Sequence, residues 1–339
     1  MFSFLKGKPA QILDVPPDMP PPVGPAATAP HQPPVEEFVP APLCQFAGDE
    51  ATQALQMGRF GRIVCEPGDW TKSPKFKSIR DQALSAMDER FALVPDGFAS
   101  IALTINGEGG SAEEDVQTAA FLLSRCDVTN ADFQKFVDAG AYENFDLWSE
   151  SVWPHLVGFK DRTGRPGPRH WRDGRHNQRL ADHPVVGVCC AEAEAYARWA
   201  GYRLPSESEW QMAASWSIRS ESNAIRRYPW GDALDLGCCN IWHSGNARTL
   251  PVQACPAGAA PNGVLQLIGN VWEWTSSEFT GVDSEGRKVI GDMSMRTIRG
   301  GAFDTYFPWQ ATSAFRSGAP TLARAHNIGF RCAMDVFEA

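Results

Sequence analysis

From Phe91 onward, glycine, proline and asparagine divide the sequence into many short apolar segments, and this limits the length of any helix or strand. Three stretches carry the apolar period and the start signals of a helix. Helices are expected over 130–139, over 191–200 and after Ser206, which forms a capping box with Glu209. The pattern predicts a loop-rich α+β domain that depends on tight local packing.

The first 90 residues differ in composition from the rest. Residues 1–45 contain nearly half of the 26 prolines and few apolar side chains, so we expect a disordered proline-rich tail that acts as a tether. A polyproline ligand for a partner's aromatic groove is the functional alternative. Residues 46–90 predict a helical extension of two short stretches, the second with an apolar face from Ile79 to Met87, which packs on the main domain.

Charge and apolar run length exclude several classes of partner. The formal net charge is -9 and no block of lysine and arginine is present, so neither nucleic acid nor an anionic membrane surface is expected as a partner. No run approaches the roughly 20 apolar residues of a membrane helix, and the N-terminus lacks the pattern of a signal peptide. We therefore expect a cytoplasmic protein.

The cysteines are 9 in number, and four of them form the adjacent pairs Cys189-Cys190 and Cys238-Cys239. An odd number with adjacent pairs is not the spacing of a disulfide framework, so we expect reduced thiols. No Cys/His spacing typical of a zinc site is present. Cys189 and Cys190 are unusual, but adjacent residues on a strand point to opposite faces, which argues against one metal ion held by both.

Arginines recur at close intervals between Asn144 and Asp182, which makes this a basic segment in an acidic protein. They are Arg162, Arg165, Arg169, Arg172, Arg175 and Arg179. Two interpretations stay open. The segment is either a solvated insertion or a loop that contacts an anionic or peptide ligand.

Eight short motifs follow one another between Phe91 and Val336. They are Leu93-Val94-Pro95 with Gly97-Phe98, Asp127-Val128-Thr129-Asn130, His183-Pro184-Val185, Tyr202-Arg203-Leu204-Pro205-Ser206-Glu207, Tyr228-Pro229-Trp230-Gly231-Asp232, Gly269-Asn270-Val271-Trp272-Glu273-Trp274, Arg299-Gly300-Gly301 and Asn327-Ile328-Gly329-Phe330-Arg331-Cys332. In this order they resemble the sulfatase-modifying-factor family, which includes formylglycine-generating enzymes and the C-terminal domains of ergothioneine-type sulfoxide synthases. The resemblance covers residues 91–336 and implies a mixed α/β fold related to C-type lectins.

The resemblance also implies structural calcium. The residues that correspond to the two calcium sites are Gln266, Gly269, Val271 and Glu273 for one, and Asn240 and Ile241 at the start of the other. Gln266 replaces the Asp or Asn of the family, which keeps a carbonyl oxygen but changes its reach, and residues 248–254 contain no carboxylate for the second site. We expect a weakened first site and no complete second one.

The active enzymes of the family oxidise a cysteine to formylglycine with copper, which two cysteines hold after the Gly-Gly motif. Soft thiolates suit Cu(I). No cysteine lies between Gly301 and Cys332, so this copper chemistry is not expected. Iron is not expected either. The sulfoxide synthases take their iron-binding histidines from a separate helical bundle, and His170, His176 and His183 do not replace it.

The interval 304–326 is rich in aromatic and charged residues, which suits a binding cleft. The candidate contact residues are Trp309, Ser313, Phe315, Arg316 and Arg324. We expect a pseudoenzyme that binds a peptide or protein partner in this cleft. Two alternatives stay open: a divergent metal-dependent oxidase or other enzyme of the non-haem iron group, and a structural subunit of an assembly attached through the proline-rich tail.

Overall fold

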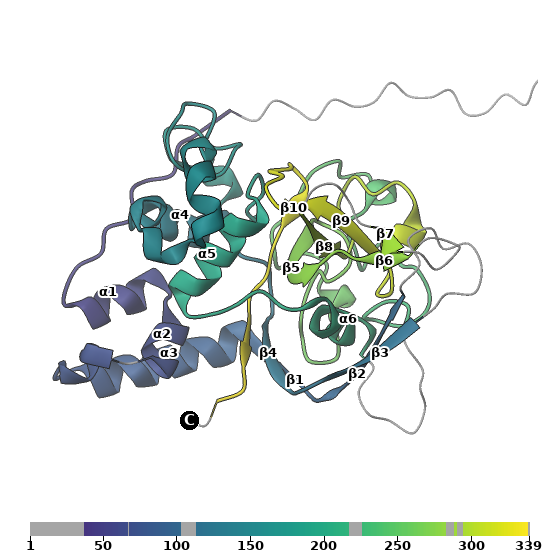
Figure 1. Cartoon of the computed structure of the whole chain (residues 1–339), viewed down its shortest axis with the longest axis horizontal. Helices are drawn as coiled ribbons and strands as arrows, with labels where there is room; N and C mark the ends of the chain where they lie inside the picture. Colours follow the sequence, from purple (N-terminus) through teal and green to yellow (C-terminus); the bar gives the residue numbers. More distant parts are fainter. Residues whose placement is uncertain are drawn as a thin grey trace, which may run out of the picture. The chain divides into compact units, whose positions relative to one another are not determined.

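The computed structural model confirms a mixture of short helices and short strands, as the sequence predicts (Figure 1). It describes residues 37–66, 68–102, 113–216, 226–282, 288–289 and 294–337. Residues 1–36, which form most of the predicted tail, lie outside the described residues. No helix among the described residues combines the length and the apolar character that crossing a membrane requires.

The α-helices are α1 Glu50–Met57, α2 Phe60–Cys65, α3 Phe76–Arg90, α4 Asn130–Asp138, α5 Cys190–Ala200 and α6 Glu207–Ser215. Short 3-10 helices are η1 Gly68–Lys72, η2 Ala141–Glu143, η3 Phe145–Leu147, η4 Glu150–Gly158, η5 Gln178–Leu180, η6 Trp242–Ser244, η7 Pro256–Gly258 and η8 Pro308–Gln310. The three helices expected after Phe91 are confirmed. The cap of α6 is also as expected, because Ser206 Oγ accepts from the Glu209 amide and Glu209 Oε2 accepts from the Ser206 amide.

Four small sheets are described, and their strands are short. The three-stranded sheet is antiparallel, in the order β1 Phe91–Val94, β4 Phe121–Ser124 and β11 Ala333–Asp335. The four-stranded sheet has the order β10 Ile328–Gly329, β5 Trp272–Glu278, β8 Met295–Arg299 and β9 Arg316–Pro320, with β10 parallel to β5 and the other pairs antiparallel. The hairpins are β2 Gly97–Ala102 with β3 Glu113–Thr118, and β6 Gly281–Val282 with β7 Lys288–Val289.

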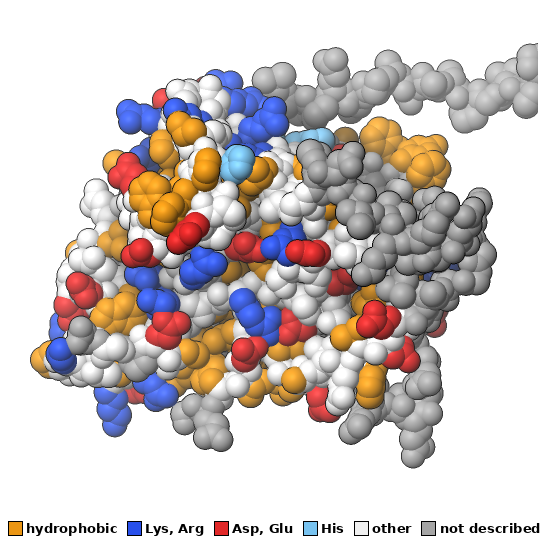
Figure 2. All heavy atoms as spheres, in the orientation of Figure 1, with side chains coloured by type: hydrophobic (Ala, Val, Ile, Leu, Met, Phe, Trp, Pro, Cys, Tyr) orange, Lys and Arg blue, Asp and Glu red, His pale blue; other side chains and the backbone are white. Residues whose placement is uncertain are grey.

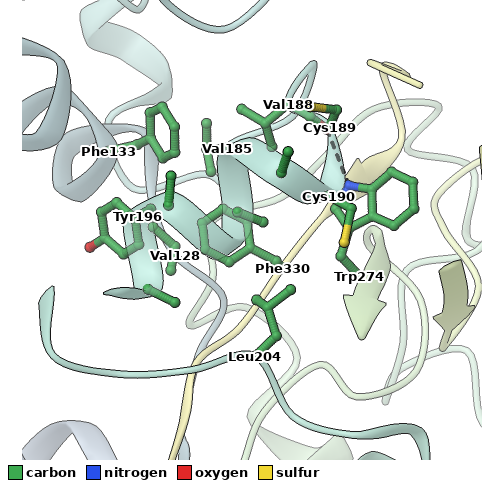
Figure 3. Close-up of a cluster of buried hydrophobic side chains, with 14 of the residues drawn as sticks. Val128, Phe133, Val185, Val188, Cys189, Cys190, Tyr196, Leu204, Trp274 and Phe330 are labelled. Atoms are coloured by element: carbon green, nitrogen blue, oxygen red, sulfur yellow. Dashed lines mark hydrogen bonds between the residues drawn. The ribbon is translucent and has the colours of Figure 1, made fainter. Parts of the chain in front are cut away.

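Motifs that are far apart in the sequence meet in the core. Helix α6 lies between the four-stranded sheet and the β2–β3 hairpin, while α4 and α5 lie together beyond the sheet (Figure 1). In the aromatic cluster of Figure 3, Tyr196 of α5 stacks on Phe133 of α4 with ring centroids 5.4 Å apart, and lies 5.5 Å from Phe330. Such contacts between distant segments replace long secondary structure as the source of stability.

The helical extension contains three α-helices, α1 to α3, where the sequence predicted two short helical stretches. Gly58, in the left-handed conformation with φ of 79°, ends α1 and lets the chain turn into α2. The extension packs on the main domain, as expected, through two glycines. A Cβ on Gly61 would lie 2.2 Å from the Gly201 carbonyl oxygen at the end of α5, so only glycine permits this approach.

Residues 37–45, which belong to the predicted tail, contact the domain. The Gln178 amide donates to the Val39 carbonyl at 2.7 Å, and the Ala41 amide donates to the His176 carbonyl at 3.1 Å. These extended backbone contacts satisfy the polar groups of both segments. The order of this stretch depends on pairing with a distant loop, which its proline content does not reveal.

Candidate functional site

Three buried glutamates attach the C-terminal residues 299–331 to the rest of the domain. The ion pairs are Glu192 with Arg324, Glu207 with Arg299 and Arg316, and Glu273 with Arg331. Each glutamate lies on a different element, namely α5, α6 and β5. A buried charge without its partner costs several kcal/mol, so these pairs strongly favour one position of the C-terminal segment.

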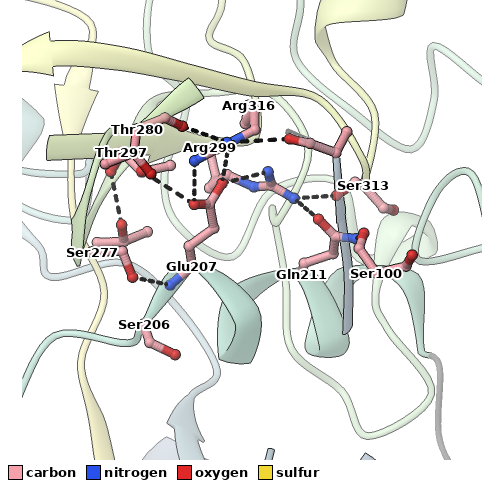
Figure 4. Close-up of polar contacts among 12 residues, drawn as sticks. Ser100, Ser206, Glu207, Gln211, Ser277, Thr280, Thr297, Arg299, Ser313 and Arg316 are labelled. Carbon is pink, nitrogen blue, oxygen red and sulfur yellow. Dashed lines mark hydrogen bonds and ion pairs between the residues drawn. The ribbon is translucent and has the colours of Figure 1, made fainter. Parts of the chain in front are cut away.

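Glu207 neutralises two arginines at once (Figure 4). Its Oε1 lies 3.1 Å from Arg299 Nη1 and accepts from Arg316 Nε at 2.8 Å, and its Oε2 accepts from Arg316 Nη2 at 2.7 Å. Arg299 Nη2 also donates to the Ser313 carbonyl at 2.7 Å and to Gln211 Oε1. Burial, together with the nearby Arg316 and against the effect of Glu207, lowers the pKa of Arg299 to about 10. The network therefore fixes the backbone at Ser313 through the Arg299 guanidinium.

Trp309, whose ring contacts that of Phe315 next to Arg316, belongs to a row of half-exposed aromatic side chains, which we call the aromatic surface. Its members are Trp242 (49% exposed), Tyr306 (57%), Phe307 (51%) and Trp309 (53%). Neighbouring ring centroids are 6.2, 5.2 and 6.0 Å apart along the row. Hydrophobic side chains gather at the upper right of the molecule in Figure 2, over η6. Contiguous exposed apolar patches of this kind mark interaction sites.

One end of the aromatic surface borders a small pocket. Its volume is about 290 Å³, and Arg226, Arg227, Trp309, Thr312 and Ala314 line it. Sequence reasoning did not select the two arginines, although they directly precede the Tyr228-Pro229-Trp230 motif. No sequence signal joins Trp242 to Tyr306, because only the fold brings η6 beside the 304–326 interval.

The predicted cleft residues divide into exposed and buried ones. Trp309 is exposed and packs on the partly buried Phe315, with ring centroids 5.2 Å apart. Ser313 is fully buried, and its hydroxyl lies 3.1 Å from the Ala214 carbonyl oxygen and 3.0 Å from that of Arg227. Arg316 is occupied by Glu207 as described. Arg324 is bound to Glu192 through Nε at 2.8 Å and Nη2 at 2.9 Å.

The side-chain oxygens of the first predicted calcium site already accept hydrogen bonds from protein donors. Asn270 Nδ2 donates to Gln266 Oε1 at 2.6 Å. Glu273 accepts from Trp210 Nε1 at 2.8 Å, and Arg331 binds both of its oxygens. Calcium needs several free hard oxygens, so this donor set does not fit the ion in the present arrangement. Calcium binding at these residues stays a prediction.

The remaining predicted calcium residues belong to the same amide network. Asn240 Nδ2 donates to Asn270 Oδ1 at 3.1 Å, and the Asn270 amide donates to the Asn240 carbonyl at 2.7 Å. A Cβ on Gly269 would lie 2.6 Å from the Asn240 carbonyl oxygen, which explains the glycine. The backbone amides of Val271 and Ile241 donate to Gly269 and to Ser244 Oγ. The Gly-Asn motif therefore has a structural role.

All of the cysteines are free thiols, in agreement with the sequence analysis. The argument from strand geometry does not apply to the unusual pair, since Cys189 caps α5 and Cys190 is its first residue. The two sulfur atoms point to different sides of the start of α5 (Figure 3). Both thiols are buried, and burial raises their pKa well above the usual value. They are protonated packing groups at neutral pH.

The histidines weighed against iron binding have separate environments. His176 Nδ1 lies 2.8 Å from the Asn177 carbonyl oxygen, and His183 Nδ1 lies 3.0 Å from Thr249 Oγ1. His170 lines a different pocket. Within the described ranges, no three His, Cys, Asp or Glu side chains form a group that could hold a metal ion.

Comparison with known proteins agrees with the residue motifs. Residues 75–336 match the family described as "Sulfatase-modifying factor enzyme 1-like domain". The chain belongs to this family. The formylglycine-generating enzyme of Streptomyces coelicolor is 34% identical over 276 residues, which cover 68% of this chain and 84% of that protein. Family membership confirms the resemblance on which the sequence analysis relied.

The chain is also similar to proteins named hercynine oxygenase, but the match covers a smaller part of their length. The hercynine oxygenase of Mycobacterium tuberculosis is 42% identical over 170 residues, 48% of this chain and 39% of that protein. That of Mycolicibacterium smegmatis is 35% identical over 241 residues, 65% of this chain and 54% of that protein. The chain therefore spans about half or less of the length of these relatives.

Solved structures of similar proteins are more distant in sequence. PvdO from Pseudomonas aeruginosa is 23% identical with a TM-score of 0.48, and covers 73% of this chain and 94% of its own. CarF is 21% identical with a TM-score of 0.49, and covers 73% of this chain and 98% of its own.

Asp127 lies next to the Glu273–Arg331 pair. Both of its carboxylate oxygens are buried without a hydrogen-bond partner among the described residues, and Arg331 Nη2 lies 3.4 Å from Oδ1. Burial, and after it the negative charge of Glu273, raise the pKa of Asp127 well above its usual value, while Arg331 opposes the shift. One arginine faces two carboxyl groups, so a proton on Asp127 removes the excess negative charge.

We expect Asp127→Asn to make the free energy of unfolding less dependent on pH. Because the pKa of Asp127 is raised in the folded state, the unfolded chain releases this proton first. The wild type therefore loses stability as pH rises from the ordinary value of 3.8 towards the raised one. Asparagine has no proton to lose, so the variant should gain stability relative to the wild type over this window. Urea unfolding at about pH 5 and about pH 8 measures the difference.

Asp132→Asn is the matched control. Against the effect of burial, Lys135 and Arg90 lower the pKa of Asp132, so its contribution is present at neutral pH and lost in acid. This variant should therefore lose stability relative to the wild type only as pH rises towards the ordinary value of 3.8, and the difference should be the same at about pH 5 and about pH 8. If the stability difference between Asp127→Asn and the wild type is likewise the same at the two pH values, the assignment of a protonated Asp127 is wrong.

Proposed function

We propose that this chain acts by binding a peptide or protein partner on its aromatic surface, without copper-dependent oxidation of cysteine. The row of four half-exposed aromatic rings from Trp242 to Trp309 supports this proposal most. Tryptophan and tyrosine are enriched among residues that dominate binding energy, with at least about 2 kcal/mol for each such anchor. The partner's contact segment would supply apolar side chains to this row.

Positive charge next to the aromatic surface indicates the chemistry of the partner segment. Arg226 and Arg227 line the pocket beside Trp309, and neither makes an ion pair with another described residue. A carboxylate on the partner segment would bind them with charge-assisted hydrogen bonds. We therefore favour a segment in which an acidic residue follows or precedes the apolar ones.

The sulfur content of the site supports a binding role. No cysteine lies between Gly301 and Cys332. Cys332 is buried, and burial raises the pKa of its thiol above the usual value. A copper site of the kind that the family resemblance implies needs thiolates. The interval between Gly301 and Cys332 contains no thiol, and the thiol of Cys332 stays protonated at neutral pH.

A second candidate function is catalysis with a different metal. It is favoured by the 42% identity to a hercynine oxygenase over 48% of this chain. In this reading the aromatic surface would bind a small substrate rather than a segment of a partner, and a metal would have to be held by residues that do not form a cluster within the described ranges.

The protein should bind less than stoichiometric copper after anaerobic loading with Cu(I) and removal of weakly bound metal by a chelator. It should also consume no oxygen with a Cys-Thr-Pro-Ser-Arg peptide. The control is Cys65→Ser, because Cys65 is an exposed thiol that can bind copper non-specifically. Stoichiometric copper that persists in Cys65→Ser, with oxygen uptake, would support the enzyme instead.

Replacement of Phe307 by the photo-crosslinking residue p-benzoylphenylalanine tests the binding surface in the native cell. We expect one predominant crosslinked partner, identified by mass spectrometry, and its loss when Trp309→Ala is added. The matched control carries the crosslinker at Val157, which is 73% exposed and belongs to η4. A pattern at Phe307 that equals the one at Val157 contradicts the proposed surface.

A further inference from the structure

The fold places five of the six arginines of the basic segment in two groups, and Arg165 belongs to neither. Lys and Arg side chains gather at the top of Figure 2, over the loops between α4 and α5. Arg172, Arg175 and Arg179 contact residues 37–41, the first through the Phe38 ring at 5.4 Å, the others through a carbonyl at 3.4 Å and a carboxylate at 3.7 Å. These three arginines are thus occupied by the chain's own N-terminal segment.

The other group lines a pocket of about 740 Å³ between the loop 158–170 and the residues 324–326. This volume lies within the range of small-molecule sites, about 300 to 1,000 Å³. The side chains that determine the charge of the pocket are Lys160, Asp161, Arg162, Arg169, His170, Arg324 and His326, the last of which lies 3.1 Å from Asp304 Oδ2.

Three of these cations have no counter-ion in the described structure. Lys160, Arg162 and Arg169 make neither an ion pair nor a side-chain hydrogen bond with another described residue. The one carboxylate of the lining, Asp161, is already used. Its Oδ1 accepts from the amide and the hydroxyl of Thr163, both at 2.8 Å, and its Oδ2 accepts from the Gly174 amide at 2.7 Å. Its oxygens hold the loop and do not bind the cations.

Arg324 holds the backbone of the loop that lines the pocket. While Glu192 binds its Nε, its Nη1 donates to the Lys160 carbonyl at 2.8 Å and its Nη2 to the Gly167 carbonyl at 2.5 Å. The loop that carries the unpaired cations is therefore fixed to the buried charge network. Because the backbone of this loop is already ordered, binding an anion would cost only the ordering of the exposed Lys160, Arg162 and Arg169 side chains.

We propose that this pocket binds a small oxyanion, the phosphate or carboxylate group of a small-molecule ligand, through Lys160, Arg162 and Arg169. This site is separate from the aromatic surface, and the inference does not rest on the proposed function.

The pKa of His170 depends on the charge of the pocket. Burial, followed by the positive charges of Arg162, His326, Arg169 and Arg324, lowers its pKa to about 4. An oxyanion that neutralises the arginines removes part of this repulsion, so its binding should raise the pKa of His170. This effect does not depend on any activity of the protein.

The test is a titration of the full-length protein with inorganic phosphate and, separately, with malonate, each against chloride at equal ionic strength. NMR of labelled histidine side chains measures the pKa of His170. We expect saturable binding of at least one anion, with a rise of this pKa. Binding of phosphate alone or malonate alone would assign the class of the ligand group. Absence of saturable binding for both, or a pKa of His170 that does not move, overturns the proposal.

Paired variants separate a specific site from general attraction of anions. Arg162→Gln with Arg169→Gln should weaken binding by about tenfold or more for each lost charge-assisted contact. The matched control, Arg165→Gln with Arg179→Gln, removes the same charge from the same segment at positions outside the pocket lining. Equal weakening in both pairs contradicts a site in this pocket.

Discussion

Trp210 joins two buried charge networks on which the position of the C-terminal segment depends. Its Nε1 donates to Glu273 at 2.8 Å, and its ring lies 5.2 Å below the guanidinium of Arg299. Glu273 in turn binds Arg331, and Arg299 binds Glu207. Each of these side chains needs its partner, because an unpaired buried charge costs several kcal/mol. Short strands and loops can therefore adopt one arrangement without long regular structure.

The residues that stabilise the fold are different from cysteines that could bind a metal. The ion pairs use residues of the family motifs, including Glu207, Glu273 and Arg331, and they need no cysteine. The interval 302–316 is held where Arg299 binds the Ser313 carbonyl, while the aromatic side chains of Phe307 and Trp309 in the same interval are half-exposed. The position of this interval thus does not depend on a cysteine, and function depends on the residues that the fold presents.

Local signals in the sequence predicted local structure well. The capping box at Ser206 correctly began α6, because a capping side chain and its amide partner lie within one turn, and the predicted start at Asn130 is that of α4. The number of helices before Phe91 was not predicted, since the left-handed turn at Gly58 interrupts an apolar pattern that otherwise continues. Family membership followed from the order of the motifs.

Residues of the site were predicted less well, because their roles depend on distant partners. Arg316 suits a cleft by its charge, yet Glu207, far earlier in the chain, occupies it. The sequence around Trp242 does not predict a binding role, and this residue joins the aromatic surface only because the fold places its ring beside that of Tyr306. Arg162 and Arg172 are equivalent in the sequence, and only the fold places one in a pocket and the other against Phe38.

The central claim is that the buried network fixes the position of the chain at Ser313, close to Trp309 of the aromatic surface. Hydrogen exchange of the Arg299→Met variant tests this claim most directly. The variant leaves Glu207 paired with Arg316 but removes the donor to the Ser313 carbonyl. The Ser313 amide, which donates to the Arg227 carbonyl, should then exchange faster, while the Leu123 amide in β4 keeps its wild-type rate. Unchanged exchange at Ser313, or an equal acceleration at both amides, would contradict the account.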